Sequence, residues 1–141
     1  MENYRNKISG PLLDRIDIHV EAPAVEYKEL SSTERAEPSA AIRERVIAAR
    51  KIQLERFSTS RKCRANAEMS HVLLKTHCQL DAQGQELLRH ALEELHLSAR
   101  AYDRILKVSR TIADLACAER IEPVHVMEAI QYRTLDRNLW H

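Results

Sequence analysis

The chain has 141 residues, and its balance of 44% apolar and 30% charged residues suits one domain, alone or with a flanking piece. The net charge of +1 gives no overall basic field of the kind that attracts nucleic acid or an anionic membrane. Only two glycines occur, which excludes a glycine-rich phosphate-binding loop from this sequence. Long stretches rich in Ala, Leu, Glu, Arg and Lys predict a mainly helical protein.

The sequence shows no recognisable targeting signal and no usual spacing of metal ligands. No apolar run approaches the roughly 20 residues that a membrane-spanning helix needs, and no signal peptide is apparent, so we expect a cytoplasmic protein with no membrane partner. Cys63, Cys78 and Cys117 are unevenly spaced, which favours reduced thiols over disulfides. Cys63 and Cys78 with His71 and His77 fit no usual zinc spacing, so we expect no metal site.

The first segment reads as a short helix followed by a strand. Residues 9–11 (Ser-Gly-Pro) are a break signal, and the proline suits the start of a short helix through residue 16. Ile18 and Val20 alternate with polar residues, as in a strand. Because a single strand has nothing to pair with, we expect its sheet to lie upstream, in a larger protein.

A long basic helix is predicted after a polar connector over residues 25–36, which has a helical turn at 27–30. The helix opens at Pro38 and Ser39 and runs to about Phe57. Its predicted apolar face is Ile42, Val46, Ala49, Gln53 and Phe57, with Ile52 at the edge; the rest carries Arg43, Arg45, Arg50, Lys51 and Arg56. That surface could neutralise nucleic-acid phosphates, but no aromatic residue is present to stack on a base. We therefore favour a solvated face paired with Glu44 and Glu55.

Three further helices are expected in addition to the helix that follows Ser98. The first begins at Asn66 or Ser70, after a polar linker, and ends near Cys78. The second takes Asp81 as its N-cap, and the last begins at Pro123. The predicted core positions are Gly84, Leu87 or Leu88, Ala91 and Leu95 in the second, and Val126, Met127, Ala129 and Ile130 in the last, with Leu135 and Trp140 packing behind it. Together with the long helix and the helix after Ser98, they predict an α-helical bundle.

The helix that follows the N-cap Ser98 carries its cations at an unusual end. Its apolar face is Ala101, Ile105, Val108, Ile112 and Leu115, whereas Arg100, Arg104 and Lys107 share another face within the first turns. A cation near a helix N-terminus costs roughly 0.3–1 kcal/mol, and a bound anion such as phosphate would reverse that cost. The alternative is that the arginines pair with neighbouring acids.

Two separated stretches resemble one family. Residues 8–20 (ISGPLLDRIDIHV) resemble the segment before the last core strand of magnesium-chelatase-like ATPases of the AAA+ class, specifically the YifB/ComM family. Residues 98–115 resemble the second sensor helix in the lid of those proteins, and residues 128–133 (EAIQYR) also match. The resemblance implies that residues 1–37 are the end of the AAA+ core and that residues 38–141 are the C-terminal helical lid.

The resemblance also implies roles for arginines. Arg15 stands at the position of the arginine finger, which reaches a nucleotide on the neighbouring subunit, and Arg100 matches the second sensor arginine, which contacts the γ-phosphate. Arg104, as a further nucleotide-binding residue, and Arg110 would support them. Asp17 either orients the Arg15 guanidinium, together with Asp14, or is a plain surface carboxylate.

The family implies ATP and Mg²⁺ in the full-length protein, bound by the upstream core, which also assembles as a homo-oligomeric ring. We expect this chain to be inactive alone and to hold neither cofactor by itself. An alternative function is a DNA-binding module of a ComM-type recombination or DNA-uptake ATPase. Metal insertion into a tetrapyrrole ranks last, since no porphyrin pocket is indicated.

Overall fold

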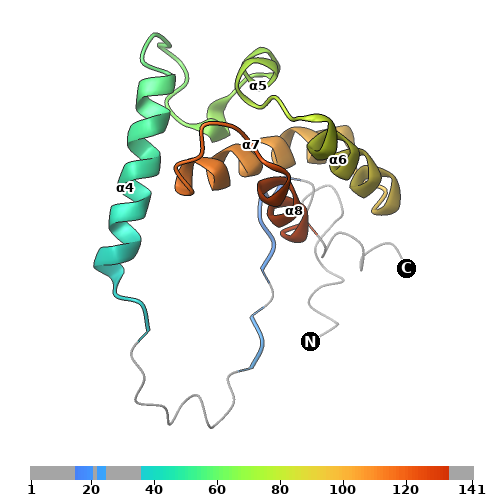
Figure 1. Ribbon diagram of the computed structural model, residues 1–141, viewed down its shortest axis with the longest axis horizontal. Coiled ribbons are helices and arrows are strands. Elements are labelled where there is room, and N and C mark those ends of the chain that lie inside the picture. The colour runs from blue at the N-terminus through green and yellow to red at the C-terminus, as the bar shows by residue number, and fades with distance from the viewer. Residues whose placement is uncertain (1–14, 21, 25–35, 134–141) are drawn as a thin grey trace.

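The computed structural model describes residues 15–20, 22–24 and 36–133 of the chain. These residues form a bundle of five α-helices and one 3₁₀ turn, and no strand occurs in the described ranges (Figure 1). The elements are α4 (Ser39–Arg56), η1 (Asn66–Glu68), α5 (His71–His77), α6 (Ala82–Glu94), α7 (Ala99–Leu115) and α8 (Pro123–Gln131). The predicted mainly helical bundle is therefore confirmed.

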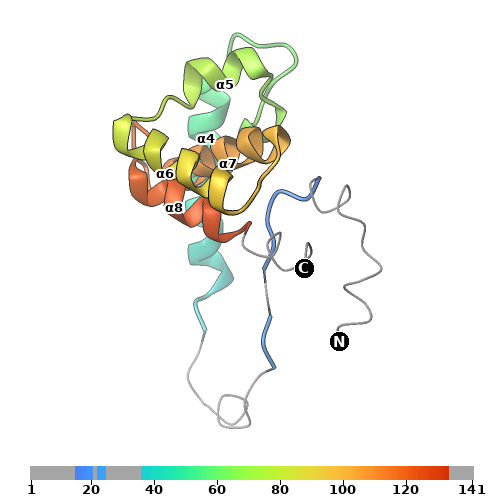
Figure 2. The same ribbon diagram turned by 90° about the vertical axis from the view of Figure 1, so that its right-hand side faces the viewer.

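Helix α7 is the centre of the bundle, and α4, α5, α8 and η1 all pack against it. Figure 2 shows α6 and α8 side by side on one side of α7, with α4 on the far side. Gly84 of α6 faces Val126 of α8: a Cβ at this glycine would lie 3.7 Å from a Val126 methyl group and 3.1 Å from the Asp81 carboxylate. The missing side chain therefore allows the two helices to approach closely.

Helices α5, α6, α7 and α8 begin at residues that the sequence predicted. The hydroxyl of Ser98 accepts a hydrogen bond from the Ala101 N–H at 3.2 Å, so this N-cap is confirmed. Ser70 and Asp81 cap α5 and α6 in the same way, and Pro123 is the first residue of α8. Each cap satisfies an N–H that has no partner inside its helix, which is why these ends can be predicted locally.

The buried face of α7 differs in part from the predicted one. Ala101 and Ile105 are buried as predicted, but Val108 and Ile112 are only half-buried and Leu115 is exposed. The buried rows instead run through Ala101, Ile105, Ser109 and Ala113, and through Leu106, Arg110 and Asp114. Because neighbours surround α7 on several sides, the buried surface includes polar residues that an apolar pattern does not reveal.

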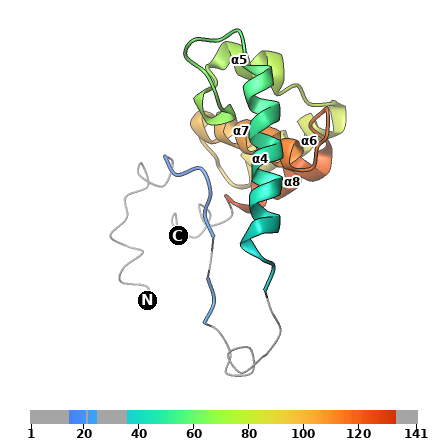
Figure 3. The ribbon, with the colours of Figure 1, turned by 90° about the vertical axis from the view of Figure 1, so that its left-hand side faces the viewer.

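Among the described residues, helix α4 packs against the bundle through its C-terminal half. Ala49, Gln53 and Phe57 are buried as predicted, whereas Ile42 and Val46 are exposed. Figures 1 and 3 show the N-terminal half of α4 extending beyond α7. The predicted apolar face is therefore correct in register but only partly covered by the described residues.

The remaining core positions are mostly as expected. In α6 the choice between two leucines falls on Leu88, which is buried, while Leu87 is half-buried. Val126 and Ala129 of α8 are buried, but Met127 is exposed, because it lies on the opposite side of that helix. The predicted packing of Leu135 and Trp140 falls outside the described residues.

The predicted strand over Ile18 and Val20 is not formed. Residues 15–20 lie beside the end of α8 and make one backbone hydrogen bond to it, from the His19 N–H to the Tyr132 carbonyl at 2.9 Å. The Arg133 guanidinium also donates to the Ile16 carbonyl. A strand needs a repeated ladder, and a single backbone bond does not make one. The predicted helix before residue 16 lies almost wholly outside the described residues, and so does the turn at 27–30.

Candidate functional site

Three cations of α7 line one hollow on the surface. Arg100, Arg104 and Lys107 are four and three residues apart, so their side chains emerge from one face of the helix. The hollow has a volume of about 230 Å³ and is completed by Asp17, Ala67 and Asp103. The structure therefore brings Arg100, Arg104 and Lys107 together on one face, as the sequence predicted.

The three cations differ in how they are engaged. Arg104 forms an ion pair with Asp17, which lies 87 positions earlier in the chain. Lys107 donates a hydrogen bond to the Ala67 carbonyl at 2.9 Å. Arg100, in contrast, is exposed and forms neither a hydrogen bond nor an ion pair with any described residue. No described residue therefore competes with a ligand for the Arg100 guanidinium.

The position of Arg100 favours an anionic ligand. It is the second residue of α7, where the backbone N–H groups and the helix dipole give a positive partial charge. A phosphate in the hollow would accept hydrogen bonds from the guanidinium and offset the repulsion between cation and dipole. The donor set of the hollow therefore fits a phosphate group, and the arrangement could bind and neutralise it.

Arg15 is exposed in a turn and does not line the hollow. Within the part of the chain that the structure describes, it makes no ion pair with the residues of α7. Asp17, two positions later, is the member of this segment that reaches α7. Of the two arginines that the sequence predicted as catalytic, the hollow therefore contains Arg100 but not Arg15.

Arg110 has a structural position that the sequence prediction did not recognise. It is buried on the side of α7 that faces the core, donates to the Asp114 carboxylate, and also donates to the carbonyls of Ala118 and Glu119. These contacts brace the turn between α7 and α8. Arg110 is therefore not a member of the cationic hollow.

Asp114 is the centre of a buried polar network. Arg56 of α4 approaches its two oxygens at 2.5 and 2.7 Å, and Asn66 donates to it at 2.7 Å. Burial by itself would raise the pKa of Asp114, but the hydrogen bonds from Arg56 and Asn66 and the charge of Arg110 outweigh it and lower the pKa below its ordinary value. The network ties α4, η1 and α7 together. Its sequence signal was the four-residue spacing of Arg110 and Asp114.

The basic residues of α4 also find partners other than the predicted ones. Arg45 forms an ion pair with Glu37, which precedes the helix, and Arg56 forms the buried pair with Asp114. Glu44 and Glu55 were the expected partners. The difference arises because both arginines reach off the helix to neighbouring segments.

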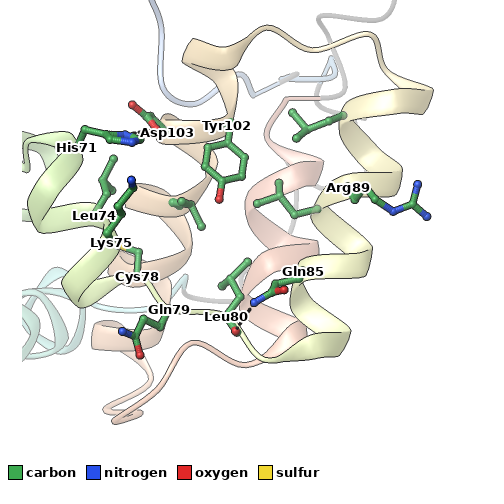
Figure 4. A pocket seen from close by; sticks show the side chains of 13 residues that line it. His71, Leu74, Lys75, Cys78, Gln79, Leu80, Gln85, Arg89, Tyr102 and Asp103 are labelled. Carbon is green, nitrogen blue, oxygen red and sulfur yellow. Dashed lines mark hydrogen bonds and ion pairs between the residues drawn. The ribbon is translucent and has the colours of Figure 1, made fainter.

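A second, larger hollow of about 700 Å³ lies between α5, α6 and α7 (Figure 4). His71 and Lys75 of α5 and Tyr102 of α7 line it in the close-up, together with several leucines. Cys78 also lines it, but burial raises the pKa of this thiol to about 12. The thiolate needed for nucleophilic chemistry is therefore scarce at neutral pH.

All three cysteines are free thiols. No group of three His, Cys, Asp or Glu side chains that could hold a metal ion occurs among the described residues, so we assign no magnesium ligand to them. None of the described helices is long and apolar enough to span a bilayer.

The helical bundle is a chelatase-like C-terminal domain. Residues 36–133 match the family model described as magnesium chelatase, subunit ChlI C-terminal, and residues 1–30 match the model described as magnesium chelatase, subunit ChlI. The chain belongs to this magnesium-chelatase-like family.

Individual relatives place the chain with ComM- and YifB-type proteins. It is 42% identical over 137 residues to the competence protein ComM of Haemophilus influenzae, a match that covers 96% of this chain and 26% of that protein. It is 39% identical over 139 residues to the YifB proteins of Salmonella typhimurium and Escherichia coli, covering 98% of this chain and 26% of each relative. The chain therefore spans about a quarter of the length of these relatives.

Proposed function

We propose that this chain is the C-terminal lid of a cytoplasmic, ring-forming AAA+ ATPase and that it supplies arginines to ATP. Arg100 contacts the γ-phosphate of ATP bound by the core of the same protein, and Arg15 reaches ATP on the neighbouring subunit. Arg104 supports Arg100. The observation that carries the proposal is the hollow at the beginning of α7, where Arg100 is exposed and has no ion pair with a described residue.

The chemistry asked of these residues is electrostatic. Transfer of a phosphoryl group to water needs little covalent assistance, but it requires positive charge around the oxygens of the transferred group. A guanidinium is planar and permanently charged, so it suits this role better than a lysine does. Mg²⁺ would supply further charge at the phosphates, with ligands from the upstream core. The lid alone therefore does not hydrolyse ATP.

Steady-state ATP turnover of the full-length protein tests this function. We expect Arg100→Ala and Arg15→Ala each to lower turnover at least about tenfold, because an arginine finger contributes about 10³–10⁵ in rate. Arg43→Ala is the matched control, since Arg43 is an exposed arginine of α4 outside the hollow, and it should keep normal turnover. Normal turnover in both Arg100→Ala and Arg15→Ala would reject the proposal.

DNA binding remains the alternative prediction from the sequence. It rested on the resemblance to ComM-type proteins and on the basic surface of α4, but Arg45 and Arg56 of that surface are engaged by carboxylates in the structure. The relative from Haemophilus influenzae carries the name competence protein, which describes that protein. We therefore favour the nucleotide-binding role.

A further inference from the structure

Contacts between described residues attach the segment that carries Arg15 to the bundle. Asp17 forms the ion pair with Arg104, the His19 N–H donates to the Tyr132 carbonyl, and Arg133 donates to the Ile16 carbonyl. The first of these contacts lies inside the cationic hollow, and the other two lie at the end of α8. One contact of residues 15–20 therefore lies where a ligand of the hollow would bind.

The Asp17 carboxylate resembles the ligand that the hollow fits. Carboxylate and phosphate both present negatively charged oxygens, and the guanidinium fork binds either of them. When Arg104 is paired with Asp17, its donors are directed toward that carboxylate and not toward a ligand in the hollow. Asp17 and a phosphate group at this place would thus compete for Arg104.

We propose that Asp17 is an internal competitor for the phosphate site, and that a nucleotide phosphate chain displaces it from Arg104 and releases the Arg15 segment from the bundle. This inference rests on the proposed function. It adds a coupling between the two arginines: binding at Arg100 and Arg104 frees residues 15–20, so that Arg15 can reach toward a neighbouring subunit. Without a phosphate chain, the ion pair holds the segment that carries Arg15 on its own lid.

The ion pair is weak enough to be displaced. The side chains of Arg104 and Asp17 keep 26% and 51% of their exposure, so water and salt screen their attraction. A phosphate chain carries several negative charges and can engage Arg100 at the same time. Removing the Asp17 charge should therefore strengthen phosphate binding by about two- to fivefold, the range expected for a partly exposed pair.

Titration of the 141-residue chain with inorganic tripolyphosphate at low ionic strength tests the inference. Affinity is followed by the amide shifts of α7, and release of the segment is followed by hydrogen exchange at the His19 amide, whose bond to Tyr132 is present in the structure. Asp17→Asn should bind tripolyphosphate about two- to fivefold more tightly than the wild type. Tripolyphosphate should also accelerate exchange at the His19 amide of the wild type.

Glu37→Gln is the matched control, because it removes an acid from another exposed ion pair, with Arg45, away from the hollow. It should bind tripolyphosphate like the wild type. Equal affinities of Asp17→Asn and wild type, exchange at His19 that does not respond to the ligand, or no binding by either protein would overturn the inference. The proposed function fails by a separate result, normal ATP turnover of full-length Arg100→Ala and Arg15→Ala.

Discussion

At the scale of single residues, Asp114 and Asp103 differ in burial, and burial determines how strongly the loss of an ion pair affects folding stability. Asp114 is fully buried and receives hydrogen bonds from Arg56, Arg110 and Asn66. Asp103 keeps 38% of its side-chain exposure and lies 3.6 Å from a nitrogen of His71. Loss of one partner from a buried ionic network leaves the others unpaired, whereas an exposed pair is screened by water.

Asp114→Asn should therefore destabilise the protein strongly. We expect a loss of about 3 kcal/mol in the free energy of unfolding, because two arginines lose their counter-charge. Asp103→Asn is the control and should cost less than about 1 kcal/mol. Urea denaturation measures both values, and similar small losses would contradict the structural role assigned to the network.

The same network predicts a pH dependence. The folded-state pKa of Asp114 lies below its unfolded value of about 4, so its stabilising contribution is fully present above that value. It is lost as the pH falls through the lower folded pKa. The stability difference between wild type and Asp114→Asn should therefore be constant above about pH 5 and should shrink below about pH 4. A difference that stays constant down to pH 3 would show that ionised Asp114 is not the source of the stability.

At the scale of elements, two helices end in the left-handed conformation without glycine. His96 after α6 has φ 49° and Cys117 after α7 has φ 55°. In each case the following N–H bonds back to the last turn, Leu97 to Leu92 and Ala118 to Ala113, as in a Schellman motif. Glycine is favoured at this position because a Cβ is strained there.

Cys117→Gly should accordingly stabilise the protein by about 0.5–1 kcal/mol, since relief of the strain exceeds the added flexibility of the unfolded chain. Ala116→Gly is the matched control, because Ala116 has φ −81° and is unstrained, and this change should destabilise. Thermal unfolding of the two variants gives the comparison. Equal destabilisation by both would mean that the left-handed turn carries no strain.

Helix starts could be predicted from sequence because each depends on a local cap, as Ser70, Asp81 and Ser98 show. Buried faces were less predictable: Leu115 and Val46 fit the apolar periodicity, but no described segment covers them. The prediction of a strand at Ile18 and Val20 was wrong, because a strand forms only when a second strand is present to pair with it. Local signals therefore determine where the elements begin, while tertiary contacts determine their packing.

The candidate site shows the same division. Arg100 and Arg104 could be placed on one face from their spacing alone, and the hollow contains both. The pairing of Arg104 with Asp17 could not be predicted, because it joins residues far apart in the chain. The burial of Arg110 could not be predicted either, because its acceptors include backbone carbonyls, which carry no sequence signal.

At the scale of the whole molecule, the chain corresponds to about a quarter of its ComM and YifB relatives. In the proposed function, neighbouring subunits contribute residues to one ATP site. A site would need Arg100 from the subunit that holds ATP and Arg15 from the next one.

Mixing of full-length variants tests this arrangement. An equal mixture of Arg15→Ala and Arg100→Ala subunits should recover about a quarter of wild-type ATP turnover, because random assembly pairs an intact Arg100 with a neighbour's intact Arg15 at that frequency. Each variant alone should remain slow. A mixture no faster than the separate variants would indicate that both arginines act within one subunit.

The most direct measurement is a structure of the full-length assembly with a bound ATP analogue. We expect the Arg100 guanidinium within hydrogen-bond distance, about 3 Å, of the γ-phosphate, with Asp17 detached from Arg104. Arg100 paired with a local carboxylate and remote from the triphosphate would contradict it.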